Sequence, residues 1–143
     1  MPTSRVEFAR RGGAQVILDL FPGCSGGTKR RLVEILSALT LMREVRRLLL
    51  TDGKVEYLVE AISLGNLASR TRAAAAQAAG MLGASSVGRS SLVAMRAPLA
   101  LVGLLKDGDS SAKLIAANAL GIHSIIKWIE FKHPIDSSNW HYT

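Results

Sequence analysis

The chain has little that could crosslink it, and few aromatic side chains with which to fill a core. It contains one cysteine, Cys24, in 143 residues, so it can form no internal disulfide bond. Aromatic residues make up only 5% of a sequence that is 48% hydrophobic. A core of Leu, Val, Ile and Ala favours close-packed helices over aromatic-rich strands. We therefore expect an all-α fold in a reducing compartment, either cytoplasmic or nuclear.

Long apolar runs are also missing. The longest candidate, residues 92–105, is interrupted by Arg96 and Pro98, and a membrane span requires about 20 apolar residues. The N-terminus lacks the apolar core of a secretory signal. Its Arg-containing sequence MPTSRVEFARR would suit an organelle transit peptide, which stays an alternative, although it aligns better with a repeat. We expect no membrane span.

The residue patterns of common enzyme sites are absent. The stretch GCSGGTK (23–29) has the glycines of a phosphate-binding loop without its Gly-Lys-Ser/Thr order. Cys24 has no histidine in a matching place to activate it, and His123, His133 and His141 are too widely spaced for paired zinc ligands. No pair of carboxylates shares a helix face for acid–base work. We expect no enzymatic activity, no cofactor and no metal.

An internal repeat is the strongest positive feature. Residues 104–105 align with residues 20–21, 84 positions earlier, and the same offset pairs Lys113 with Lys29. A middle copy aligns with the third at an offset of 43 before its central turn and 41 after it. Self-similarity at this period is typical of stacked helical repeats.

Each copy predicts three helices, and together the copies form one domain, residues 1–127. The repeats are expected at 4–42, 45–83 and 88–124, followed by a non-repeat, disordered tail at 128–143. The expected helices are 4–13, 14–21 and 28–42 in the first copy, 45–54, 55–64 and 69–82 in the second, and 88–97, 98–105 and 110–123 in the third.

Several residues predict where these helices begin and turn. Gly12 and Gly53 fit the sharp corner between the first two helices of their copies, where a positive φ costs glycine little. Arg96 occupies that place in the third copy and predicts a different corner. Thr28, Ser69 and either Asp109 or Ser110 are expected to be the N-caps of the third helices.

The repeat pattern resembles the armadillo repeat. Residues 99–121, LALVGLLKDGDSSAKLIAANALG, carry the likeness most clearly, and it covers about residues 4–124. The segments GKVEYLVEAI and TRAAAAQAAGMLG are similar to plant armadillo proteins, including those related to U-box ligases. The resemblance implies a right-handed α-α superhelix, an armadillo solenoid with uncapped ends, whose third helices line a concave groove that binds protein.

The same resemblance indicates which residues line the groove. Where the family often has Trp, and four residues later Asn, this sequence has other side chains in all three copies. The matching residues form a polar column of Glu34, Gln77 and Asn118 and an apolar column of Ala38, Met81 and Ile122. We expect a shallow, mixed groove for a partner peptide or helix; the alternative is an unused surface.

A basic ladder accompanies the groove, and the net charge is +7. Lys29, Arg72 and Lys113 stand at one position of successive copies and predict a stripe along the rim that would bind an acidic protein or phosphate. The alternative is a row of solvated charges that serves solubility.

These patterns together predict a non-enzymatic protein-interaction scaffold. One alternative, from the resemblance alone, is the substrate-binding segment of a plant ubiquitin-ligase system, although this chain contains no U-box. Another is nonspecific nucleic-acid binding through the basic stripe, which would weaken steeply with salt.

Overall fold

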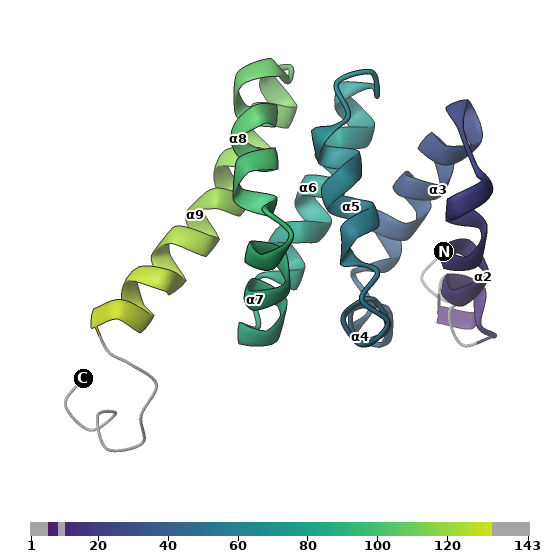
Figure 1. The fold of residues 1–143 in the computed structure, drawn as a ribbon, viewed down its shortest axis with the longest axis horizontal. Helices are drawn as coiled ribbons and strands as arrows, with labels where there is room; N and C mark the ends of the chain where they lie inside the picture. Colours follow the sequence, from purple (N-terminus) through teal and green to yellow (C-terminus); the bar gives the residue numbers. More distant parts are fainter. Residues whose placement is uncertain (1–5, 9–10, 133–143) are drawn as a thin grey trace.

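The structure is a computed structural model that describes residues 6–8 and 11–132, with side chains described up to Gly121. All regular secondary structure in this part of the chain is helical, which confirms the expected all-α class there. The elements, numbered as in Figure 1, are α2 (Gly13–Leu20), η1 (Phe21–Gly23), α3 (Gly26–Leu39), α4 (Arg43–Thr51), α5 (Val55–Ser63), α6 (Ser69–Leu82), α7 (Ser86–Ala94), α8 (Ala97–Asp107) and α9 (Ser110–Lys132).

The helices form neighbouring groups in chain order along the longest axis of the molecule (Figure 1). Helices α2 and α3 make up the first group, α4 to α6 the second, and α7 to α9 the third. Helix α6 packs against α3 on one side and against α9 on the other, and α5 packs against α8. The third helices α3, α6 and α9, and likewise the second helices α5 and α8, are therefore neighbours in space in the order of the sequence copies.

Most helix bounds agree with the repeat alignment to within a few residues. Of the expected helix 4–13, residues 6–8 are helical and residues 11–12 form a turn, while residues 4–5 and 9–10 lie outside the described part. Helix α6 covers the expected 69–82, and α5 and α7 differ from expectation by only a few residues. Helix α9 continues past residue 124 to Lys132, so residues 128–132 of the expected tail are helical. The remainder of that tail, 133–143, lies outside the described residues.

The helix starts use only part of the expected capping chemistry. Asp109 accepts a hydrogen bond from the backbone N–H of Ala112 at 2.9 Å and so caps α9. Thr28 lies inside α3, which begins at Gly26, and Ser69 is the first residue of α6. The Ser69 hydroxyl instead accepts from the backbone N–H of Asp109 at 3.3 Å, which links the starts of α6 and α9.

The three corners before α2, α5 and α8 share one backbone conformation. Gly12 and Gly53 have φ values of 83° and 67°, as expected. Arg96 has φ 61° and ψ 35°, so the prediction of a different corner in the third copy is wrong. The packing of α7 and α8 holds an L-residue in the left-handed region at this place.

The core consists of small and branched aliphatic side chains. Leu36 of α3 is fully buried, whereas the equivalent Leu120 of α9 is only partly buried. In α6 the alanines at 75–76 and 78–79 are fully buried. Because α6 is enclosed by α3, α5 and α9, its alanines allow close approach on several sides.

Two equivalent arginines, Arg46 of α4 and Arg89 of α7, hydrogen-bond the C-terminal ends of the third helices that precede them. Arg46 donates from Nη1 to the carbonyl oxygens of residues 40–41 at 2.7 and 3.0 Å. Arg89 donates from Nη1 to those of residues 83–84 at 3.0 and 3.2 Å. The carbonyl groups at the end of a helix lack partners within it, so these arginines satisfy the C-terminal ends of α3 and α6.

Within residues 6–8 and 11–132, no single helix is both long enough and apolar enough to cross a bilayer. In the same part of the chain, α7 and α8 taken together, bent by 75°, reach that length and hydropathy.

Candidate functional site

The residues predicted to line a groove lie on the three neighbouring helices α3, α6 and α9. Glu34 and Ala38 are one turn apart on α3, Gln77 and Met81 are one turn apart on α6, and Asn118 lies on α9. A spacing of four residues places both members of a pair on one helix face. The last predicted residue, at position 122, lies in α9, but its side chain is outside the described part.

The structure brings the five described side chains together around adjoining hollows. A hollow of about 260 Å³ between α3 and α6 is lined by both pairs, Glu34 with Ala38 and Gln77 with Met81. A second hollow of about 400 Å³ between α6 and α9 is lined by Gln77, Met81 and Asn118. The shared Gln77 and Met81 join these into one surface, which we call the groove.

The floor of the groove is mostly small and apolar, with free amides along it. Gly80 and Ala119 line the α6–α9 hollow, and a Cβ on Gly80 would lie only 3.5 Å from the Ala119 Cβ. The amides of Gln77 and Asn118 are exposed and have no hydrogen-bond partner in the described part of the chain. The groove therefore offers apolar contact together with amide donors and acceptors that a ligand could satisfy.

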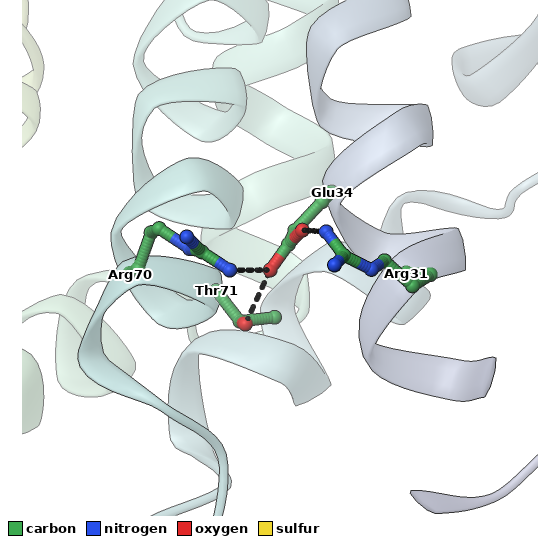
Figure 2. A network of polar contacts seen from close by, with 4 residues as sticks. All are labelled: Arg31, Glu34, Arg70 and Thr71. Atoms are coloured by element: carbon green, nitrogen blue, oxygen red, sulfur yellow. Dashed lines mark hydrogen bonds and ion pairs between the residues drawn. The ribbon is translucent and has the colours of Figure 1, made fainter. Parts of the chain in front are cut away.

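Glu34 bridges α3 and α6 through a small polar network, drawn in Figure 2. The Thr71 hydroxyl donates to its Oε1 at 2.9 Å, and Arg31 donates from Nη1 to its Oε2 at 3.2 Å. Arg70 Nη2 lies 3.7 Å from Oε1. The carboxylate is thus already engaged by three neighbours, and its role is to join the two helices at the edge of the groove.

The predicted basic ladder is not one exposed stripe. Arg72 is buried, only 5% exposed, and donates from Nε to the Ile62 carbonyl oxygen at 2.8 Å. Lys29 pairs with Glu60 of α5 at 3.2 Å. Lys113 alone is exposed without a partner in the described residues. The ladder fails at its middle position because α6 packs against the C-terminal end of α5 there, and the guanidinium satisfies a helix carbonyl.

A different group of basic side chains borders the groove. Arg43, Arg46 and Arg47 of α4 form one wall of a hollow of about 620 Å³, and Met81 and Val87 lie among the residues of the other wall. We call this the arginine hollow. The side chains of Arg43 and Arg47 are exposed and make no hydrogen bond or ion pair within the described part. Because Met81 also lines the groove, the two sites adjoin.

Sequence reasoning missed the arginine hollow, although the signal for it was present. Arginines at i, i+3 and i+4 lie on one face of a helix, and residues 43–47 have this spacing. The repeat alignment singles out only Arg46, since only that position recurs in other copies. The opposite wall comes from residues 81–87. The spacing of the arginines in α4 does not indicate that this segment lies opposite them.

A further hollow, of about 470 Å³, surrounds the glycine-rich start of α3. Cys24, Lys29 and Arg30 line it, and the partly buried Cys24 has no histidine among the residues that share the lining. No group of three or more His, Cys, Asp or Glu side chains that could hold a metal occurs in the part searched, which is the described part. The candidate site, to which several helices contribute side chains, is therefore the groove with the adjoining arginine hollow.

Comparisons with family models, with curated proteins and with solved structures find no match to this chain.

Proposed function

We propose that this protein is a non-enzymatic interaction scaffold whose helices form an armadillo-type solenoid, a right-handed superhelix of three-helix repeats. Its groove binds one segment of a partner protein. One observation carries the proposal: residues aligned from three sequence copies line adjoining hollows that share Gln77 and Met81. Exposed amides beside an apolar floor suit a peptide or helix, which presents both backbone polar groups and apolar side chains.

The charge around the groove favours an acidic partner. Arg43, Arg46 and Arg47 line the arginine hollow without an acidic residue in the same lining. At the other end, two arginines surround the single carboxylate of Glu34. A partner that places an apolar side chain at Met81 and carboxylates beside α4 would satisfy both features, because guanidinium groups bind carboxylates with directional hydrogen bonds.

The ubiquitin-ligase alternative would use the same groove to hold a substrate, so the experiment below applies to it as well. The nucleic-acid alternative depended on a continuous basic stripe, and the burial of Arg72 removes the middle of that stripe. A cytoplasmic or nuclear location is part of the proposal, as the single cysteine suggests.

The proposal can be tested by selecting binders from a displayed library of random peptides. We expect the selected peptides to combine acidic residues with a large apolar residue, and to lose binding to the Gln77→Ala/Met81→Ala variant. The control is Leu99→Ala, which removes an exposed apolar side chain of α8 that lines neither hollow of the groove. Peptides that bind the groove variant and the wild type equally would contradict the proposal.

A further inference from the structure

Positions that are buried between the second and third copies are exposed at the C-terminal end of the array. Ile62 of α5 is 0% exposed, whereas its equivalent on α8, Leu105, is 38% exposed. Val59 is buried as well, and its equivalent Val102 is exposed. The sequence retains an apolar side chain at both positions even though no described helix covers them.

Helix α9 shows the same change relative to α6. Ala73 of α6 is 5% exposed, whereas its equivalent on α9, Leu114, is 63% exposed. Ala76 is buried and its equivalent Ala117 is exposed. Together Val102, Leu105, Leu114 and Ala117 form an open apolar surface, which we call the C face.

The opposite end of the array has the complementary exposure. Leu20 of α2 is 51% exposed, whereas its equivalent Ala61 is 1% exposed. Ile35 of α3 is exposed, and its equivalents Ala78 and Ala119 are buried. We call the surface of Leu20 and Ile35 the N face.

The packing of α6 against α9 shows which neighbouring copy would cover the N face. Ala119, the third-copy equivalent of Ile35, lies against Gly80 of the preceding helix α6. Ile35 therefore stands where a preceding copy would pack. The C face, in turn, stands where a following copy would pack, since α5 and α6 are covered there by α8 and α9.

An ion pair between the first and second copies indicates the same alignment of one copy on the next. Lys29 of the first copy pairs with Glu60 of the second at 3.2 Å. Lys113 is the third-copy equivalent of Lys29, and Asp19 is the first-copy equivalent of Glu60. Both are exposed, and Lys113 has no partner in the described residues. The two open ends thus carry complementary charges at matching positions.

We propose that a second copy of this chain stacks head to tail on the first, with the C face of one molecule against the N face of the next. The joint repeats the internal contact of α5 and α6 with α8 and α9, and Lys113 pairs with Asp19 across it. Such an interface is heterologous, so it leaves one free face at each end and allows growth beyond a dimer. The inference concerns the ends of the array and is independent of what the groove binds.

Sedimentation velocity of the whole chain tests the proposal. We expect the weight-average mass of the wild type to rise past that of a dimer as concentration increases over about a hundredfold range. Leu20→Glu/Ile35→Glu blocks the N face, and Leu105→Glu/Leu114→Glu blocks the C face. Each variant alone is expected to be monomeric, because each keeps only one functional face.

Mixing the two blocked variants is the decisive measurement. The intact C face of one joins the intact N face of the other, so the mixture is expected to form a dimer and nothing larger. A monomeric wild type, self-association of either blocked variant, or a mixture that stays monomeric would each overturn the proposal. Circular dichroism and melting of each variant establish that it is folded, and all substituted side chains are at least partly exposed.

A matched control and a charge exchange test the register. Leu99→Glu changes an exposed leucine of α8 whose equivalent, Glu56, is already exposed and charged, so self-association should be unchanged. Lys113→Glu, added to the variant whose C face is intact, should weaken the mixed dimer about two- to fivefold. Asp19→Lys, added to the variant whose N face is intact, should then restore the dimer. A loss of association by Leu99→Glu, or no restoration by the exchange, would overturn the proposed joint.

Discussion

Gly53 and Arg96 hold the same left-handed backbone conformation at equivalent corners of successive copies, with φ values of 67° and 61°. Gly53 precedes α5 and Arg96 precedes α8. Glycine adopts this conformation readily, but a side chain there brings Cβ close to the following carbonyl oxygen and costs about 1–2 kcal/mol. The third copy therefore contains strain that the first two avoid.

Arg96→Gly should stabilise the protein by about 0.5–1 kcal/mol, since relief of the left-handed strain exceeds the entropy lost by ordering glycine. The measurement is the midpoint of urea unfolding at unchanged slope. Gly53→Ala is the matched control and should lower stability by about 1 kcal/mol. A Cβ at Gly53 meets no atom within 4 Å, so that loss reports the backbone alone. Unchanged midpoints in both variants would contradict the assignment of strain to this corner.

The corner also marks a limit of what could be predicted from the sequence. Glycine at positions 12 and 53 signalled a positive φ correctly, because residue type and conformation agree there. Arg96 led to a wrong prediction because the packing of α7 against α8 determines the backbone conformation of this corner. The arginine adopts the left-handed conformation although its residue type does not favour it. Repeat offsets predicted most helices well, since they depend on periodicity and not on any single residue.

Burial was harder to predict than helix position. Lys29, Arg72 and Lys113 are equivalent in sequence, yet Lys29 is paired, Arg72 is buried, and Lys113 is exposed with no partner among the residues that the structure describes. Their surroundings differ because Arg72 turns toward the end of α5 in its own copy and donates to the Ile62 carbonyl oxygen, whereas Lys29 reaches Glu60 of the next copy. The positions of the groove residues followed more directly from the sequence, because a four-residue spacing puts Gln77 and Met81 on one face of α6, where both line the same two hollows.

The hydrogen bond between Thr71 and Glu34 should contribute to the packing of α3 on α6. Thr71 is fully buried and its hydroxyl donates to a carboxylate, an interaction that typically contributes about 1.5–3 kcal/mol. Thr71→Val should therefore lower the free energy of unfolding by about that amount, and Thr71→Ser, which keeps the hydroxyl, by less. Arg31→Gln should cost under about 1 kcal/mol because its ion pair with Glu34 is exposed. Equal losses for the valine and serine variants would contradict a role for the hydroxyl.

Leu36 is expected to be among the most sensitive core positions. It is fully buried at the contact of α3 with its neighbours, so Leu36→Ala should cost about 2–5 kcal/mol through lost burial and a residual cavity. Leu41→Ala, at an exposed leucine just after α3, is the control and should cost less than about 1 kcal/mol. Thermal and chemical unfolding measure both. A melting temperature equally insensitive to the two substitutions would mean that the repeat core is assigned wrongly.

The arginine hollow and the groove should affect different steps of partner binding. Arg43 and Arg47 are exposed and unpaired within the described residues, so they act on an approaching charge through solvent. Charges at the edge of an interface mainly change the association rate and its dependence on salt. Met81 lies where the groove and the arginine hollow meet, so its side chain would lie within the contact and affect dissociation.

For an acidic peptide obtained by selection, Arg43→Gln/Arg47→Gln should slow association about three- to tenfold at low salt, and the difference should shrink as salt rises. Met81→Ala should mainly speed dissociation. Lys106→Gln/Lys113→Gln removes the same charge from exposed positions of α8 and α9 that line neither the groove hollows nor the arginine hollow, and should leave both rates within about twofold. Surface plasmon resonance at several salt concentrations separates the two rates. Slower association of the lysine variant, with the arginine variant unaffected, would contradict an anion-binding role for α4. It would assign that role to the position of Lys113, because the charges that speed association are those closest to the approaching partner.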